Sequence, residues 1–246
     1  MAGSALSTLR RVAKRGLYRT TPRVTGHAGA PSVVVAYNEL GAYCLPRAAL
    51  HRPACRAVMQ GQVWERETLQ FLCEHCGDGD IVHAGTFFGD FLPALSRAAA
   101  PGAKLWAFEP LAESWRCAKA TAALNDLANV ELRHAALGDS AEPVALRTLD
   151  KDGLPLGGAA HVGGGTGGEL APQARIDDTV PAERRVSLIQ LDVEGFEGAA
   201  LAGAAETLRR WRPLVVVESL PPEFAEAHGY VFDRLVDGNA VLRPAD

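Results

Sequence analysis

The sequence lacks several features that would assign it to a functional class at once. It has no run of about 18 apolar residues, so no transmembrane segment is predicted. Its net charge of −4 over 246 residues gives no general attraction to nucleic acid, and no nucleic-acid partner is predicted. The glycine run at residues 163–168 lacks the Lys-Ser or Lys-Thr ending of a phosphate-binding loop. That run is typical of a plain surface loop or of a mobile lid near a site.

Cysteine is scarce and odd in number, and no secretory signal precedes it. Reduced thiols in a cytoplasmic protein are therefore predicted. One pair has the spacing C-x-x-C, but no second Cys or His pair stands at the spacing that a zinc site needs, so structural cysteines are predicted. The five cysteines are Cys44, Cys55, Cys73, Cys76 and Cys117.

Acidic residues are absent from the start of the chain up to Glu39, whereas six Lys and Arg residues lie in the first 23 positions. Residues 1–32 are therefore interpreted as a basic, flexible N-terminal segment. An arm on a partner subunit of a homo-oligomer, a contact with anionic membrane and a mitochondrial presequence stay open as alternatives. Residues 33–78 are predicted to form a hairpin and a helix, and residues 79–246 the main domain.

Residues 80–110 have the pattern of a strand, a tight glycine turn, a helix and a second strand. The first strand is predicted at residues 81–84, the turn at 85–89, the helix at 90–100 and the second strand at 104–108. Two glycines in such a turn let the backbone approach a ligand closely, and an acid after the second strand, Glu109, can accept both hydroxyls of a ribose. This unit predicts a cofactor that contains a nucleoside.

The remaining apolar runs continue the alternation of strands and helices. Strands are predicted at residues 130–134, 174–180, 187–191 and 214–218, a terminal strand pair at 229–232 and 240–242, and helices at 111–124 and from about 197 to 211. Continuous apolar strands alternating with helices indicate a mostly parallel sheet covered on both faces. Ligands of such sheets bind outside the carboxyl ends of the strands. The polar residues at these ends are His83, Glu109, Asp192 and Glu218.

Four segments, at residues 79–89, 106–110, 136–139 and 191–197, occur in an order and spacing that resemble the FkbM family of S-adenosylmethionine-dependent methyltransferases. The resemblance extends from about Trp64 to Glu218. It implies a class I methyltransferase (Rossmann-like) fold, an α/β three-layer sandwich around a seven-stranded, mostly parallel sheet with an antiparallel last strand. It also implies S-adenosylmethionine as the cofactor.

The resemblance assigns expected roles to single residues. Gly85 and Gly89, with Thr86 between them, would make room for the methionine part of the cofactor, and Glu109 would hold the ribose hydroxyls. Ala136 and Leu137 would lie along the adenine.

Two positions depart from the family's pattern. The family usually has Asp at the position of His83 and Asn at that of Phe87. We interpret Asp90, directly after the glycine turn, as a replacement carboxylate, and we place both His83 and Asp90 in the cofactor site.

Family members methylate hydroxyl groups, so O-methylation of a sugar, glycan or natural product is the expected reaction. Asp192 and Glu194 are the candidates for orienting the acceptor or removing its proton, whereas Glu197 is interpreted as a helix cap. No metal is predicted; a divalent cation held by Asp192 and Glu218, with Asp177 or Asp178, stays an alternative.

Two other functional classes stay open. One is a catalytically altered binding protein that keeps the Rossmann-like fold. The other is an NAD-dependent oxidoreductase, which the spacing Gly85-x-x-x-Gly89 disfavours because it departs from the G-x-G-x-x-G fingerprint.

Overall fold

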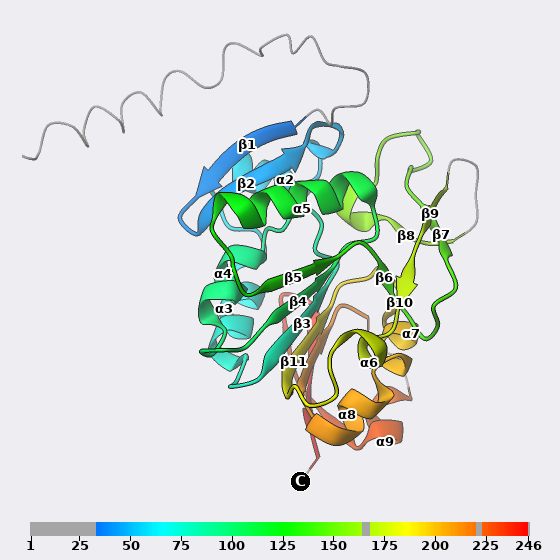
Figure 1. The fold of residues 1–246 in the computed structure, drawn as a ribbon. Coiled ribbons are helices and arrows are strands. Elements are labelled where there is room, and N and C mark those ends of the chain that lie inside the picture. Colours follow the sequence, from blue (N-terminus) through cyan, green and yellow to red (C-terminus); the bar gives the residue numbers. More distant parts are fainter. Residues whose placement is uncertain (1–32, 164–167, 220–222, 246) are drawn as a thin grey trace, which may run out of the picture. The chain divides into compact units, whose positions relative to one another are not determined.

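A seven-stranded sheet with the strand order β13-β14-β12-β11-β3-β4-β5 organises the structure (Figure 1). The structure is a computed structural model that describes residues 33–163, 168–219 and 223–245. β14 pairs antiparallel with β12 and β13, and the other pairings are parallel. The strands are β3 (Asp80–Ala84), β4 (Leu105–Phe108), β5 (Val130–Arg133), β11 (Val186–Leu191), β12 (Leu214–Val217), β13 (Tyr230–Val236) and β14 (Asn239–Pro244).

The chain runs from β3 outward to β5 on one side of the sheet and from β11 outward to β12 on the other. The sheet therefore has a topological switch point between β3 and β11, where doubly wound folds bind ligands. These observations confirm the predicted fold class, including the antiparallel last strand, which is β14 in chain order.

Helices cover both faces of the sheet. One face carries α3 (Arg66–His75), α4 (Leu92–Ala98) and α5 (Ala112–Leu124), and the other α6 (Ile176–Thr179), α7 (Glu197–Ala202), α8 (Ala205–Trp211) and α9 (Phe224–His228). Alternate strand residues supply the two cores, because successive side chains of a strand point to opposite faces. None of the helices within the described ranges is long and apolar enough to cross a membrane.

A hairpin precedes this sheet and packs on α5. Its strands are β1 (Val33–Asn38) and β2 (Gly41–Pro46), followed by the 3-10 helix η1 (Arg47–Ala49) and by α2 (Pro53–Met59). The amide of Cys44 donates to Thr121 Oγ1 at 3.0 Å, and the Asn125 side chain bonds both backbone groups of Ala42. The hairpin and the sheet belong to one compact unit, Ser32–Asp246. The division at residue 78 stays a prediction.

Short strands fill the region between β5 and β11. β6 (Ala136–Leu137) pairs with β10 (Gln173–Ala174), and β7 (Val144–Arg147) lies between β8 (His161–Val162) and β9 (Glu169–Ala171). A second 3-10 helix, η2 (Gly157–Ala159), precedes β8. Residues 164–167 of the glycine run lie outside the described residues, as do the basic segment 1–32 and the prolines at 221–222.

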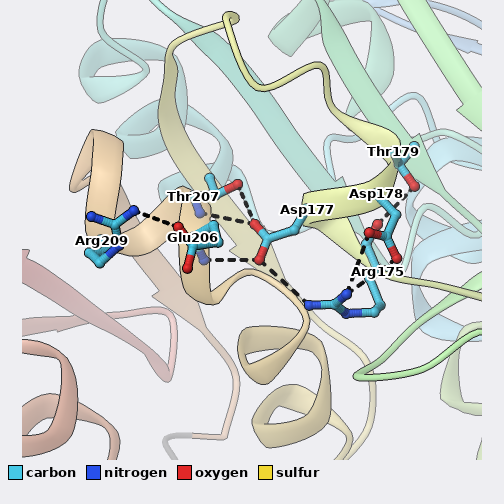
Figure 2. Close-up of polar contacts among 7 residues, drawn as sticks. All are labelled: Arg175, Asp177, Asp178, Thr179, Glu206, Thr207 and Arg209. Carbon is cyan, nitrogen blue, oxygen red and sulfur yellow. Dashed lines mark hydrogen bonds and ion pairs between the residues drawn. The ribbon is translucent and has the colours of Figure 1, made fainter.

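The strand predicted at residues 174–180 is wrong. β10 ends at Ala174 and α6 follows, because Asp177 accepts hydrogen bonds from the backbone amides of Glu206 and Thr207 and from the Thr207 hydroxyl (Figure 2). These bonds supply partners for the free amides at the start of α8.

The single helix predicted from about 197 to 211 is also interrupted, since Gly203 separates α7 from α8. A Cβ atom at Gly203 would lie 1.9 Å from the backbone oxygen of Gly138, so the helix passes very close to the turn after β6. This close contact places the end of α7 against the turn after β6.

Asp80, at the start of β3, connects three strands at the end of the sheet opposite the switch-point rim. Its carboxylate, 3% exposed, accepts hydrogen bonds from the Lys104 amide and the Trp106 indole, each within 2.8 Å, and from the guanidinium of Arg184. Burial alone would raise the pKa of Asp80, but these donors outweigh it and hold the pKa below its ordinary value.

We predict that Asp80→Asn lowers the free energy of unfolding by roughly 2–4 kcal/mol, because it leaves Arg184 without its buried partner. Urea denaturation at pH 7 measures this. The control is Asp78→Asn, whose pair with Arg185 lies on the surface with 73% of the Asp78 side chain exposed; it should change the stability by under about 0.5 kcal/mol. Equal effects of the two substitutions would contradict the structural role of Asp80.

Candidate functional site

The four inner strands end level with one another at the switch-point rim. The last residues in register are Phe108, Ala84, Leu191 and Val217. The residues that follow them, in order across the sheet, are Glu109, Gly85, Asp192 and Glu218. Backbone bonds continue past the strand ends, since the amide of Asp192 donates to Ala84 and that of Glu218 to Leu191, at 3.1 and 3.2 Å. The polar residues predicted at the strand ends therefore lie together along this rim.

Two cavities adjoin at the rim and share the wall residues Gly85, Gly158 and Asp192. The first cavity, of about 200 Å³, is rich in carboxyl groups, and its described lining includes one side chain with a permanent positive charge, Arg52. Its acids are Glu65, Asp90, Asp192, Glu194 and Glu218. The second cavity is mainly apolar, with Glu109 at its wall, and includes Phe108, Leu111, Ala136, Leu137, Val193 and Phe196.

Gly85 sits at the junction of the two cavities because no other residue fits there. Its φ of +84° lies in the left-handed region, and a Cβ atom would lie 1.9 Å from the backbone oxygen of Asp192. The missing side chain brings β3 and β11 into close contact at the rim and leaves the junction open.

Glu109 is buried, with 4% of its surface exposed, and both of its carboxylate oxygens accept backbone hydrogen bonds. Oε2 accepts from the Phe87 amide at 2.7 Å, and Oε1 accepts from the Leu111 amide at 2.8 Å. Burial raises the pKa of Glu109 to about 8. Because each carboxylate oxygen has a second lone pair, the group can still accept hydrogen bonds from a ligand in the second cavity.

Phe87 adopts the left-handed conformation, with φ +48°, that aims its amide at Glu109. Asn tolerates this conformation better than Phe, so the Asn that the resemblance leads us to expect here would be less strained. Here the phenyl ring packs on Phe88 and under Gly157 and Gly158, where an added Cβ would lie within 3.2 Å of the ring. Contacts with the ring therefore hold the strained residue in place.

His83 forms part of the wall of the first cavity and is 2% exposed. Its Nδ1 pairs with Gln190 Oε1, and its ring stacks on Phe91 with the centroids 5.7 Å apart. Burial lowers the pKa of His83 to about 4, so the ring is neutral at pH 7. Because the carbonyl oxygen of Gln190 can only accept, Nδ1 carries the proton and Nε2 keeps its lone pair.

Asp90, Asp192 and Glu194 hold protons more tightly than ordinary carboxyl groups. Burial raises the pKa of Asp90 to about 7, and burial together with the nearby Glu218 raises the pKa of Asp192 to about 8. Burial and Glu218 also raise the pKa of Glu194, which has a strained φ of +53°. A cation bound among these groups would relieve their mutual repulsion.

The structure separates the predicted site residues into these two groups. His83, Asp90 and Glu194 line the first cavity, Glu109, Ala136 and Leu137 line the second, and Gly85 and Asp192 line both. Thr86 and Gly89 are not among the lining residues of the two cavities. A Cβ atom at Gly89 would meet Leu92 and Ala118, so this glycine allows close packing of α4 on α5. The cofactor roles of Thr86 and Gly89 stay predictions.

Asp177 and Asp178 do not lie with Asp192 and Glu218. Asp177 caps α8 and Asp178 pairs with Arg175 at 3.4 Å, on the face of the sheet that α6 covers (Figure 2). The alternative that adds either residue to a cation site is therefore wrong, and Glu194 is the acid that joins the other two. In the described residues, atoms of Asp192, Glu194 and Glu218 lie within 4.8 Å of one another.

Sequence reasoning missed Gln190, Glu65 and Gly158 as site residues. Gln190 gave a signal, since it is the single polar side chain inside the apolar run of residues 188–191. Glu65 reaches the cavity through a left-handed turn, with φ +43°, just before α3. Gly158 lies far along the chain from every motif and gave none.

The sequence profile of the methyltransferase FkbM domain matches residues 76–239, more than half of the chain. The chain belongs to the FkbM methyltransferase family. The family is one of S-adenosylmethionine-dependent methyltransferases, and the matched residues include the whole rim of the FkbM domain described above. No curated protein matches the chain.

Solved structures of methyltransferases resemble the chain at low identity. The methyltransferase FkbM from Methylobacillus flagellatus KT has a TM-score of 0.47 and 15% identity over 68% of this chain and 43% of that one. A tRNA (uracil-54, C5)-methyltransferase of Pyrococcus abyssi, in complex with S-adenosyl-L-homocysteine, has a TM-score of 0.45 and 12% identity. The match covers 85% of this chain and 43% of that one. TYW2 of M. jannaschii, in complex with AdoMet, has a TM-score of 0.46 and 12% identity, and the match covers 88% of this chain and 85% of that one. The chain thus spans less than half the length of the first two.

We predict that Gly85→Ala destabilises the FkbM domain far more than Gly195→Ala. Both glycines have a left-handed φ, +84° and +88°, but a Cβ at Gly195 meets nothing within 4 Å, whereas one at Gly85 overlaps the Asp192 backbone. Gly195→Ala should therefore cost only the conformational strain, about 1 kcal/mol. Thermal and urea denaturation compare the two variants. Equal losses of stability would show that the contact between Gly85 and Asp192 is not a constraint.

Proposed function

We propose that this FkbM domain transfers the methyl group of S-adenosylmethionine to a hydroxyl oxygen of a small molecule or glycan. The observation that supports it most is the meeting of an apolar cavity and a carboxyl-rich cavity at Gly85 and Asp192. The residues that line the apolar cavity suit an adenosine, with Glu109 accepting the ribose hydroxyls and Leu137 along the adenine. The sulfonium then lies at the junction, where acids of the first cavity favour a positive charge.

The methionine end of the cofactor would extend into the first cavity. Asp90 is a carboxylate there, and the neutral His83 offers a lone pair at Nε2, so both can accept hydrogen bonds from the cofactor's α-ammonium group. This pairing gives a physical reason why His83 can stand where the family usually has Asp. The cofactor roles of both residues are part of the proposal.

The transfer is an in-line displacement, in which the acceptor oxygen attacks the methyl carbon while the carbon–sulfur bond breaks. The cofactor leaves as S-adenosylhomocysteine, and the hydroxyl proton passes to a base. Asp192, on the wall shared by both cavities, and Glu194 beside it would orient the hydroxyl and accept its proton. The raised pKa of Asp192 makes it a stronger base than an ordinary aspartate.

Two alternatives remain for comparison. A catalytically altered binding protein would keep cofactor affinity without transfer, and an NAD-dependent oxidoreductase would bind a dinucleotide. A cytoplasmic location and a homo-oligomeric state stay predictions.

Titration calorimetry with S-adenosylmethionine and with NAD tests the proposal. We expect saturable binding of S-adenosylmethionine and none of NAD. Glu109→Gln should weaken binding about 10- to 100-fold, because one of the two acceptor oxygens becomes an NH₂ donor, which can accept neither from a ribose hydroxyl nor from the backbone amide that it faces. Glu131→Gln, an acid of β5 that pairs with Lys104, is the control and should bind as the wild type does.

A second readout is the transfer of a radiolabelled methyl group from S-adenosylmethionine to a panel of hydroxylated sugars, compared with their deoxy analogues. Binding without transfer to any acceptor in the panel would favour the altered binding protein. Binding of NAD in preference to S-adenosylmethionine would contradict the proposed function.

A further inference from the structure

The three acids Asp192, Glu194 and Glu218 converge from two adjacent strand ends. Asp192 and Glu194 follow β11, and Glu218 follows β12. Each offers a carboxylate oxygen, and these oxygens lie within 4.8 Å of one another. In an octahedral site with bonds of about 2.1 Å, neighbouring ligands lie about 3 Å apart and opposite ones about 4.2 Å apart, so small side-chain rotations bring this group to ligand spacing.

The wall of the same cavity carries a polar atom that needs a partner. His83 is 2% exposed, and its Nε2 has no hydrogen-bond partner among the described residues. His83 lines the same cavity as the three acids, and Nδ1 is tied to Gln190 on the neighbouring strand, so Nε2 is the ring nitrogen left for a ligand. A buried lone pair is costly unless a donor occupies it, which points to a ligand or to its bound water in this cavity.

The charges of the cavity indicate which ligand fits. Its described lining has five carboxyl groups and one guanidinium, that of Arg52, so the cavity favours a cation. Three carboxylate oxygens are hard donors of the kind that Mg²⁺ and Mn²⁺ prefer, and no thiol lies in the described lining. Waters would complete the coordination, and in the cofactor-free protein one of them can donate to His83 Nε2, the acceptor that the cofactor's ammonium group uses in the proposed complex.

We propose that Asp192, Glu194 and Glu218 bind a hard divalent cation, Mg²⁺ or Mn²⁺, beside the junction of the two cavities. Its catalytic use rests on the proposed methyl transfer, although the binding site does not. In the proposed transfer the cation would bind the acceptor hydroxyl and lower its pKa, and the proton would pass to water, because Asp192 and Glu194 would then be cation ligands and no longer the base. The three carboxylates then act on the acceptor through the cation.

Mn²⁺ titration of the full chain without cofactor tests this, with free Mn²⁺ followed by its electron paramagnetic resonance signal. We expect one saturable site with a Kd below about 1 mM, and competition by Mg²⁺. Asp192→Asn and Glu218→Gln should each weaken Mn²⁺ binding at least about 10-fold. The matched control is Glu65→Gln, an acid of the same cavity outside the group of three, which should change the Kd by less than about threefold.

The absence of saturable Mn²⁺ binding would overturn the proposal, as would an equal loss in Glu65→Gln, which would mean that the cavity attracts cations only by its total charge. Circular dichroism of each variant shows whether it is folded. If a substitution at Asp192 prevents folding, Glu194→Gln replaces it in the same comparison.

S-adenosylmethionine binding, measured on the same samples, separates the two claims. Mn²⁺ binding without cofactor binding keeps the cation site and contradicts the proposed function. Cofactor binding without Mn²⁺ binding keeps the proposed function and contradicts the cation site.

Discussion

The site depends on one backbone contact, the approach of β3 to the carbonyl of Asp192 at Gly85. The two strands pair in register up to Ala84 and Leu191, and the amide of Asp192 still bonds to Ala84 beyond them. The contact lies at the switch point of the sheet, so it opens a crevice between the turns that follow the strands. Any side chain at Gly85 would separate the strands and close the junction between the cavities.

The carboxyl groups on either side of Gly85 impose a second constraint, which is electrostatic. Glu109 lies on one side of Gly85, and Asp192 and Glu218 lie on the other, at the ends of adjacent strands. Burying these carboxyl groups together costs free energy, which appears as raised pKa values at Glu109 and Asp192. Such a site is more stable with positive charge bound, either the sulfonium and ammonium of the cofactor or a divalent cation. The closely spaced buried carboxyl groups thus explain both the affinity of the site for cations and the free-energy cost of the site without them.

Strained backbone conformations also occur around the first cavity. In the part of the chain that the structure describes, six residues other than glycine have a positive φ, and Glu65, Phe87 and Glu194 among them line the first cavity. Such conformations persist where the surroundings enforce them, and they are frequent at functional sites. Here each one aims a carboxyl group or an amide at the rim.

The rim could be predicted from the sequence because the signals for it lie in short, continuous stretches of the chain. Apolar runs marked the strands, and polar residues directly after them, such as Glu109 and Asp192, had to lie at one edge of a parallel sheet. Residues 174–180 were misjudged because Ile176 and Val180 suggested a strand, whereas Asp177 is held by α8, 29 and 30 residues further along the chain. Glu65 and Gly158 reach the site through long-range packing, which no local pattern reports.

The arrangement of ligands around Gly85 is the central claim, and a crystal structure of the protein with S-adenosylhomocysteine tests it most directly. The account predicts the sulfur at the junction beside Gly85 and Asp192, the ribose hydroxyls on Glu109, and the adenine against Leu137. A cofactor bound elsewhere, or one whose ribose has no contact with Glu109, would contradict it.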